Sequence, residues 1–249
     1  MHLSIIIPAY NEEKRLCRTL LEINSYILAQ PYESEIIVVN DGSTDRTNEL
    51  VEAMLPKIKN LRFIDNRQNH GKGYAVRQGM LQAKGEHRLF TDADNSTSID
   101  HIEKMWPLFE RGFDIVIGSR DAKDAEGACQ VVAQPSWKRF LGNLGNIGIQ
   151  LFALWGVWDT QCGFKALTRS VAEDIFKRCK INSWAFDVEV LVLARKLGYK
   201  VGVIPVYWID SSGSKVKLKA YTSFFKELLQ IRWNFILHRY KLKETKKII

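Results

Sequence analysis

The stretch RLFTDADNST, residues 88–97, decides the fold because an apolar run ends there in two aspartates. Side chains alternate along a strand, so Asp92 and Asp94 would point to the same side of a strand end. Two such carboxylates suit a hard divalent cation that also holds phosphate. A polar turn in which Asp and Ser cap a helix is the simpler alternative, since short motifs are weak evidence. The rest of the chain has to decide between them.

Short apolar runs alternate with longer helix-like segments around that stretch. The runs predicted as strands are 3–7, 35–40, 61–65, 86–91 and 113–118. The segments predicted as helices are 12–29, 45–58, 74–83 and 99–111. Ser98 is the expected N-cap of the last one. This alternation predicts an α/β fold, a mostly parallel Rossmann-like sheet with helices on both faces.

Polar clusters follow the carboxyl ends of four of these strands. They are 8–12, 40–43, 92–94 and 118–120. Ligands of open α/β sheets bind at that edge, so all four clusters should line one rim and form one site.

The charge of the chain is concentrated at its C-terminal end. The 249 residues have a formal net charge of +8, with 46% hydrophobic and 26% charged residues, as in an ordinary folded protein. Residues 215–249 contain ten Lys or Arg and two Asp or Glu, which accounts for the whole excess. A basic tail favours an anionic membrane surface as partner, and no nucleic acid is expected.

Cysteine usage and hydropathy indicate where the chain works. The four cysteines are widely spaced without a C-x-x-C pair, which predicts free thiols in a reducing compartment. The first apolar run is too short for a signal peptide, and no run approaches the roughly 18 apolar residues of a membrane span. We therefore expect a cytoplasmic protein, peripheral on the inner face of a membrane.

The second half contains two amphipathic segments. Apolar and Trp residues recur at helical spacing in 136–158, which is either a core helix or an interfacial one; Trp at its edges and basic residues near its start favour the interface. After a further strand (200–206), residues 221–240 predict a C-terminal amphipathic helix. The expected organisation is a catalytic domain, 1–215, followed by a basic tail, 216–249.

Several charged residues are candidates for binding phosphate or nucleotide. Asp41 could accept from a base or ribose, or could cap the next helix. Lys72 lies between two glycines but without the spacing of a P-loop. Arg120, Arg139 and Lys215 could bind phosphates, although a cation of this kind taken alone is more often a solvated surface charge.

Taken together, the motifs resemble those of family 2 inverting glycosyltransferases with the GT-A fold. The resemblance spans nearly the whole chain through SIIIPAYNEE, VVNDGSTD, HGKG, DAD and GSR, which begin at residues 4, 38, 70, 92 and 118. Three further motifs are most similar to the dolichyl-phosphate β-glucosyltransferases among the polyprenyl-phosphate sugar synthases. They are DTQCGFK, WAFDVE and GSKV, at 159–165, 184–189 and 213–216.

The resemblance implies a role for each motif residue. The residues implied for the nucleotide sugar are Pro8, Tyr10, Glu12, Asp41, Gly42, Lys72, Asp92 and Lys215. Asp92 and Asp94 would also hold Mg²⁺ or Mn²⁺ and, with Arg120 and Asp187, form the catalytic group. Arg120, Arg139 and Ser136 would receive the acceptor phosphate. Gln161, Gly163 and Trp184 would lie near the sugar and the acceptor.

The implied reaction is transfer of a hexose from a nucleotide sugar to a polyprenyl or dolichyl monophosphate, with inversion. In the mannose synthases the corresponding segment resembles D-R-x-x-G-x-S-K. Residues 210–215 here read DSSGSK, without the Arg. UDP-glucose is therefore favoured over GDP-mannose. The alternatives are a mannose synthase, a family 2 enzyme with a soluble acceptor, a non-catalytic nucleotide-sugar binder and a nucleotidyltransferase.

Overall fold

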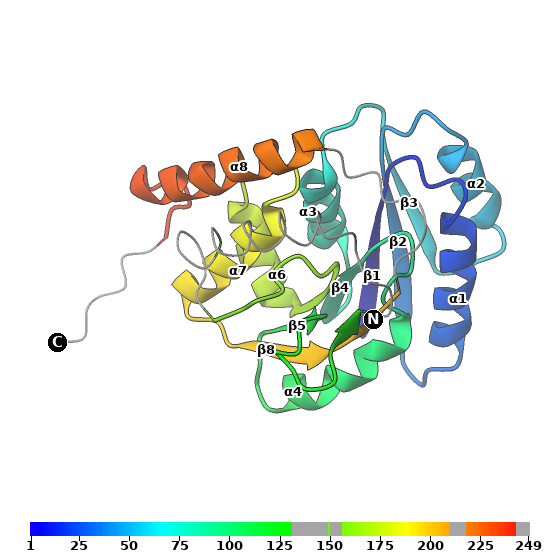
Figure 1. Ribbon diagram of the computed structural model, residues 1–249. Helices are drawn as coiled ribbons and strands as arrows, with labels where there is room; N and C mark the ends of the chain where they lie inside the picture. Colours follow the sequence, from blue (N-terminus) through cyan, green and yellow to red (C-terminus); the bar gives the residue numbers. More distant parts are fainter. Residues whose placement is uncertain (131–148, 150–155, 210–217, 243–249) are drawn as a thin grey trace.

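A computed structural model describes residues 1–130, 149, 156–209 and 218–242 (Figure 1). Seven strands form one sheet in the order β3-β2-β1-β4-β7-β5-β8. Their bounds are β1 (Leu3–Ala9), β2 (Ser34–Asp41), β3 (Leu61–Asn66), β4 (His87–Thr91), β5 (Ile115–Ser119), β7 (Phe164–Thr168) and β8 (Val201–Pro205). All are parallel except β7, which pairs antiparallel with both β4 and β5. The predicted mostly parallel sheet is confirmed.

Helices cover both faces of the sheet, as predicted. Their bounds are α1 (Leu16–Leu28), α2 (Thr47–Met54), α3 (Lys72–Gln82), the 3₁₀ helix η1 (Ile99–Lys104), α4 (Trp106–Glu110), α6 (Arg169–Arg178), α7 (Phe186–Leu197) and α8 (Leu218–Ile236). One apolar layer joins the sheet to α1, α2 and η1, and the other joins it to α3, α6, α7 and α8. Figure 1 shows these two groups on opposite sides of the strands.

The antiparallel strand β7 brings a later part of the chain to the same rim as the parallel strands. Because β7 runs against β4 and β5, its first residue, Phe164, pairs with Thr91 at the carboxyl end of β4. The residues just before β7 therefore lie beside those that follow β4. This is how the motif at 159–165 reaches the DAD motif across about 70 residues of sequence.

The single helix predicted over 99–111 is wrong in detail. Pro107 stands near the start of α4, and the segment divides into η1 and α4 at Met105. Proline lacks a backbone N–H and is tolerated only in a first helical turn, so the chain begins a new helix there. Ser98 makes no side-chain cap; its Oγ lies 3.1 Å from Nδ1 of His101 instead.

A two-stranded ribbon lies outside the main sheet. Its strand β6 (Cys129–Gln130) pairs in parallel with β9 (Tyr207–Trp208). Of the predicted segment 136–158, the structure describes Ile149, which is buried in the apolar layer of α7, and residues 156–158. Ser136, Arg139 and Lys215 lie outside the described residues.

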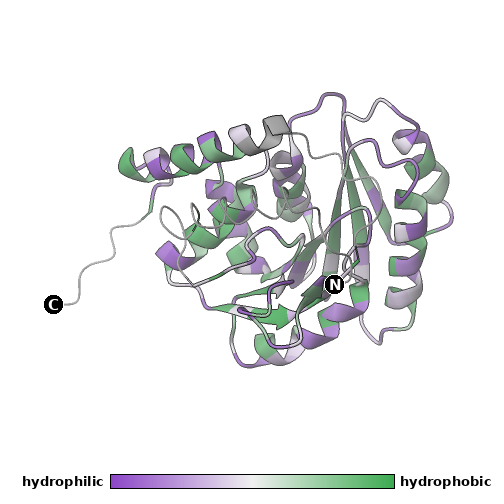
Figure 2. Ribbon diagram, in the orientation of Figure 1, coloured by the Kyte–Doolittle hydropathy of each residue, from purple (hydrophilic) through white to green (hydrophobic). Residues whose placement is uncertain are grey.

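The predicted C-terminal helix is present as α8, which packs on the α7 side of the molecule (Figure 1). Leu228, Ile231 and Asn234 are buried against the domain. Leu229, Trp233 and Ile236 are exposed, and hydrophobic and hydrophilic residues alternate along the helix (Figure 2). Within the described part of the chain, no helix is both long and apolar enough to cross a membrane.

Candidate active site

The loops after β1 and β2 are joined by Asn11. Its Oδ1 accepts from the backbone N–H of Thr44 at 2.8 Å, and its own N–H donates to Oγ of Ser43 at 2.9 Å. Asn11 adopts a left-handed φ of 56°, which asparagine tolerates better than most residues. This arrangement leaves the neighbouring Tyr10 43% exposed above the rim, while Pro8 is buried within β1.

Asp41 organises the turn that leads into α3. Its two carboxylate oxygens accept from the backbone N–H groups of His70 at 3.0 Å and Gly71 at 2.7 Å. The helix-capping alternative is wrong, because α2 begins without a side-chain cap and Asp41 instead binds the backbone just before α3. Gly42 has a φ of 70°, and a Cβ there would lie 2.5 Å from the backbone carbon of Gln68. Only glycine fits this contact without moving the backbone.

Lys72 and Asp92 form an ion pair at the centre of the rim. Lys72 is the first residue of α3, and its Nζ lies 2.6 Å from Oδ1 of Asp92, which follows β4. Burial by itself would lower the pKa of Lys72, but the carboxylates of Asp92 and Asp187 outweigh it and raise that pKa. Lys72 therefore stays a cation, and its ammonium group neutralises the carboxylate of Asp92.

Gly163 lies directly against the Asp92 carboxylate. A Cβ at Gly163 would stand 2.1 Å from Oδ2 of Asp92, far inside van der Waals contact. The absence of a side chain at this position is what allows the strand β7 to approach the end of β4 so closely. The structure thus brings together two residues predicted for different parts of the site.

Asp94 is linked to the loop after β1. Its Oδ1 accepts from the backbone N–H of Ser96 at 3.0 Å, and its Oδ2 lies 3.5 Å from Arg15. Arg15 also pairs with Glu12 at 2.6 Å. Glu12 and Asp94 are therefore connected through the guanidinium of Arg15, a residue that was not predicted for the site.

A buried ion pair lies beneath the rim. Nζ of Lys165 lies 2.5 Å from Oδ1 of Asp187 and 2.5 Å from the backbone oxygen of Cys162. Both side chains are almost fully buried, and Lys165 also stands over the ring of Phe90. Burial raises the pKa of Asp187, against the opposing effect of Lys165 and Lys72. Lys165 was missed, although a lysine inside the apolar run FKALT was a signal for it.

Arg120, predicted for the acceptor phosphate, is paired with Asp159. Two guanidinium nitrogens donate to the Asp159 oxygens at 2.7 and 2.8 Å, and the backbone N–H of Arg120 donates as well. Burial would raise the pKa of Asp159, but Arg120 outweighs it and lowers that pKa. Asp124 supports the pair by accepting from the backbone N–H of Asp159 at 2.7 Å. Asp159 and Asp124 were not predicted, though Asp159 opens a quoted motif.

Some buried polar atoms near the rim remain available. Among the described residues, those with no hydrogen bond include Oγ of Ser96, Oγ1 of Thr160 and Nε2 of Gln161. Buried polar groups are nearly always satisfied, so these atoms suit a ligand rich in hydroxyl or phosphate oxygens. Trp184, 41% exposed, lies three residues before Asp187. Ile209 donates its N–H to the backbone oxygen of Ser96 at 3.0 Å, which places it beside the DAD motif.

The residues present fit a divalent cation that is shared with a phosphate ligand. The described residues contain no cluster of three or more acidic, His or Cys side chains that could hold a metal by themselves. Mg²⁺ is commonly bound through one or two carboxylates together with substrate phosphates. Asp92 offers one such carboxylate, and the ammonium of Lys72 already occupies a cation position beside it. Asp94 offers the second.

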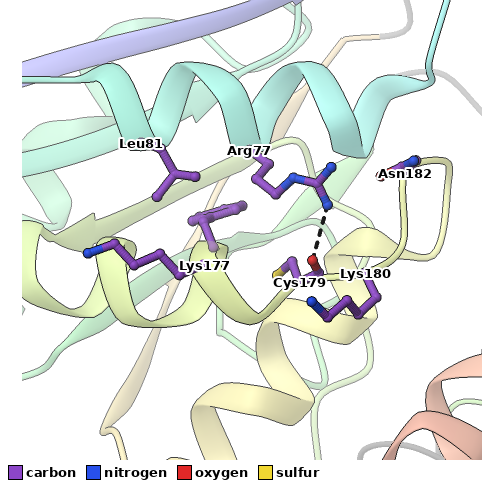
Figure 3. Close-up of a pocket in the computed structure, with 7 residues that line it drawn as sticks. Arg77, Leu81, Lys177, Cys179, Lys180 and Asn182 are labelled. Atoms are coloured by element: carbon purple, nitrogen blue, oxygen red, sulfur yellow. Dashed lines mark hydrogen bonds between the residues drawn. The ribbon is translucent and has the colours of Figure 1, made fainter. Parts of the chain in front are cut away.

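A pocket of about 540 Å³ lies elsewhere, between α3 and α6 (Figure 3). It is lined by Arg77, Leu81, Phe176, Lys177, Cys179, Lys180 and Asn182. None of these was predicted as a site residue, and the chemistry described above lies at the strand ends. The pocket is therefore not the candidate active site.

The sheet and its charged rim fit a nucleotide-binding α/β enzyme, and comparison with known protein families names the family. Residues 4–176 match the family described as Glycosyl transferase family 2. Together with the relatives described next, this match shows that the chain belongs to that family.

Within the family, several relatives carry one name. A dolichyl-phosphate β-glucosyltransferase of Trichomonas vaginalis is 35% identical, covering 96% of this chain and 74% of the relative. Those of Dictyostelium discoideum and Homo sapiens are 35% and 34% identical, covering 98% and 99% of this chain and 77% and 79% of theirs. The resemblance stated from the motifs is confirmed: these enzymes are the group to which the chain is similar.

Solved structures share the fold. Glucosyl-3-phosphoglycerate synthase of Mycobacterium tuberculosis, with Mn²⁺, UDP and phosphoglyceric acid, has a TM-score of 0.67 at 16% identity, over 98% of this chain and 80% of that one. S. aureus TarS with UDP-GlcNAc has a TM-score of 0.59 at 18% identity, over 100% of this chain and 76% of that one. At these identities the likeness establishes the GT-A-like fold.

Proposed function

We propose that the chain transfers glucose from UDP-glucose to a polyprenyl monophosphate of the dolichyl type, with inversion at the anomeric carbon. The observation that carries the proposal is the meeting of Asp92, Lys72 and Gly163 at one strand end, in a chain similar over nearly its whole length to dolichyl-phosphate β-glucosyltransferases. Residues 1–215 would be the catalytic domain and 216–249 a basic tail.

The donor would bind over the loops after β1, β2 and β4. Pro8, Tyr10, Glu12, Asp41 and Gly42 would shape the nucleoside side. Asp41 would act there through the turn that it caps, because both of its oxygens already accept from backbone N–H groups.

The diphosphate would lie near Lys72, Asp92 and Asp94. In the described ion pairs at the rim and directly beneath it, there are five carboxylates (Glu12, Asp92, Asp94, Asp159, Asp187) and four basic side chains (Arg15, Lys72, Arg120, Lys165). An anionic diphosphate therefore needs added positive charge. A divalent cation held by Asp92 and Asp94 would neutralise the leaving diphosphate. Lys215 would add a further cation.

The acceptor phosphate needs positioning more than deprotonation. A phosphate monoester carries about −1.5 to −2 charges at pH 7 and is already nucleophilic. Asp187 is held in place by its ion pair with Lys165, so its carboxylate would have a fixed position in the site. Arg120, with Arg139 and Ser136, would receive the phosphate, and Gln161 and Trp184 would border the sugar. Exclusion of water and in-line placement supply the rate enhancement.

The tail helix α8 would bring the enzyme to its lipid acceptor. Leu229, Trp233, Ile236 and Leu237 are 63%, 57%, 57% and 43% exposed and recur at helical spacing on one face. Lys226, Arg232 and Arg239 are exposed on the same segment. Apolar side chains flanked by basic ones suit an anionic leaflet, where each Lys or Arg contributes about 1 kcal/mol. We place the enzyme peripherally on the cytoplasmic face of a membrane.

A donor panel tests the proposal. The purified chain is given UDP-glucose, UDP-galactose, UDP-N-acetylglucosamine or GDP-mannose, with Mg²⁺ or Mn²⁺ and a detergent-solubilised polyprenyl phosphate. We expect lipid-linked β-glucose from UDP-glucose alone, identified by mass spectrometry and β-glucosidase release. Transfer from GDP-mannose only, or transfer to phosphoglycerate and not to the lipid, would contradict it.

A further inference from the structure

The connection between α6 and α7, residues 179–185, contacts two helices that are distant in sequence, α3 and α8. Towards α3, the backbone oxygen of Cys179 accepts from Arg77 at 3.1 Å (Figure 3), and that of Asn182 accepts from the N–H of Tyr74 at 3.0 Å. A Cβ at Gly71 would lie only 2.4 Å from the same Asn182 oxygen. The connection is therefore packed directly on the first turn of α3, which carries Lys72.

The tail helix α8 holds the other end of this connection. Oε2 of Glu227 accepts from the backbone N–H of Ala185 at 2.8 Å. Ala185 is the N-cap residue of α7, two residues before Asp187. Its N–H belongs to the helix terminus that has no partner within α7, so a carboxylate there satisfies a donor and complements the helix dipole. A side chain of the tail thus caps the helix that carries Asp187.

A second link comes from the chain just after α8. The hydroxyl of Tyr240 donates to Oε1 of Glu189 at 2.7 Å, and both residues are buried. The Glu189 carboxylate also accepts from the N–H groups of Lys180 at 2.9 Å and Ile181 at 2.9 Å. Arg178 donates to the backbone oxygen of Tyr240 at 3.0 Å. The tail therefore fixes both ends of the connection.

We propose that Glu227 and Tyr240 are positioning residues for the active site: through the α6–α7 connection they hold Lys72 against Asp92, and Asp187 against Lys165. The tail helix α8 would then position residues of the active site as well as bind the membrane. This inference rests on the proposed function for its kinetic consequence, and its structural consequence can be measured without any substrate.

The geometry makes the direction of the effect clear. Without the Glu227 carboxylate, the N-terminus of α7 loses a capping acceptor and the connection is held less firmly. Lys72 is reached through one further hydrogen bond, from Tyr74 to Asn182. Displacements of about 1 Å at reacting groups can cost about a hundredfold in rate, so a partial loosening should lower turnover without removing any group that contacts substrate.

The test compares Glu227→Ala with Glu227→Gln in detergent, where recruitment to a membrane plays no part. An amide oxygen can still accept from Ala185, so the Gln variant should keep wild-type turnover. We expect the Ala variant to lose about tenfold in kcat, with KM for UDP-glucose changed less than about twofold. Gln230→Ala, an exposed position on the same helix, is the matched control. Tyr240→Phe should lower kcat in the same direction.

Hydrogen exchange of the substrate-free protein supplies the independent readout. In Glu227→Ala, backbone amides should exchange faster in residues 180–187. They should also exchange faster in residues 71–76, at the start of α3, which α8 reaches only through the connection. Faster exchange confined to the immediate neighbours of Ala185, or equal loss of kcat in the Ala and Gln variants, would overturn the proposal. If the wild-type protein transfers no glucose, the proposed function fails, while the exchange pattern still decides whether the tail positions the site.

Discussion

The two sides of the rim are built in different ways. After β1, β2 and β4, side chains bind the backbone of neighbouring loops, as Asn11 does for Thr44 and Asp41 for His70 and Gly71. Around β5, β7 and α7, charged side chains bind one another, in the pairs Arg120–Asp159 and Lys165–Asp187. The first side combines such backbone contacts with the ion pairs of Arg15 and Lys72, whereas the second depends on buried charges that each need a partner.

Asp92 lies where the two sides meet, and its replacement should have the largest effect. Asp92→Asn removes a charge from the proposed cation and diphosphate site and leaves Lys72 without its nearest carboxylate. We expect kcat/KM to fall about 10³-fold, since charge stabilisation of this kind supplies several kcal/mol. Asp92 is 34% exposed, so the melting temperature should stay near wild type.

The matched control for that variant is Asp100→Asn, the same chemical change at an aspartate that is 70% exposed on η1. It should retain wild-type activity. An Asp92→Asn enzyme that kept most of its metal-stimulated turnover would show that the cation and diphosphate are not held at this strand end.

Breaking the Arg120–Asp159 pair should affect stability first. Their side chains are 18% and 8% exposed, so Asp159→Asn leaves a guanidinium without its carboxylate in a largely buried place. Removing one partner of a buried pair costs about 3 kcal/mol at the lower end of the measured range. Urea unfolding of the two proteins at neutral pH measures the loss. On the other side of the rim, Asn11→Ala should cost about 2 kcal/mol, because it removes the bond from Thr44 and places an alanine at a left-handed φ of 56°.

The same pair gives a pH signature. Arg120 lowers the pKa of Asp159 below its usual value of 3.8, so the folded state binds that proton less readily than the unfolded chain. The stabilisation is complete above pH 3.8 and is lost as the pH falls below it. The wild-type advantage over Asp159→Asn should therefore be constant near neutrality and shrink below that pH. A difference that grows on acidification would contradict the pairing.

Gly163→Ala tests whether the two sides need their close approach. The new Cβ would stand 2.1 Å from Asp92 Oδ2, so that carboxylate must move. We expect turnover to fall about thirtyfold to a hundredfold, because displacement of a binding group by about 1 Å has effects of this size. Gly127→Ala is the control for backbone strain, since a Cβ there meets nothing within 4 Å but an alanine is strained at its positive φ of 86°. Equal activity of the two variants would mean that the contact has no functional weight.

Sequence reasoning was strongest on the side of the rim built from local motifs. The strands β2, β1 and β4 are parallel neighbours in the sheet, so the rule that ligands bind at the carboxyl ends of parallel strands was enough to group Tyr10, Asp41 and Asp92. What it could not supply was which N–H group donates to each carboxylate. Asp41 binds a turn some 30 residues later, and no local pattern encodes that distance.

On the other side, the missed residues depend on long-range pairing. Lys165 reaches Asp187, and Arg120 reaches Asp159, only because β7 inserts antiparallel between β4 and β5. A lysine in an apolar strand and an aspartate opening a motif were visible, but their partners follow from strand order. The helix break at Pro107 was visible in the sequence and was missed because apolar periodicity continues across it.

The exposed face of α8 extends the comparison to the membrane, with the smallest expected effect. Replacing Leu229 and Trp233 together by Glu removes two side chains that are 63% and 57% exposed and places negative charge on the proposed lipid-facing side. Each apolar side chain that inserts contributes about 1.5–3 kcal/mol when fully buried, and less in an interface. Binding to liposomes with anionic lipid should weaken about tenfold in flotation, while kcat in detergent should stay near wild type because Glu227 and Tyr240 are retained. Leu21→Glu, on the exposed face of α1, is the control and should leave flotation unchanged. If the α8 variant floated like wild type, the anionic-surface contact would have to lie elsewhere in the chain, and α8 would act only through its buried side.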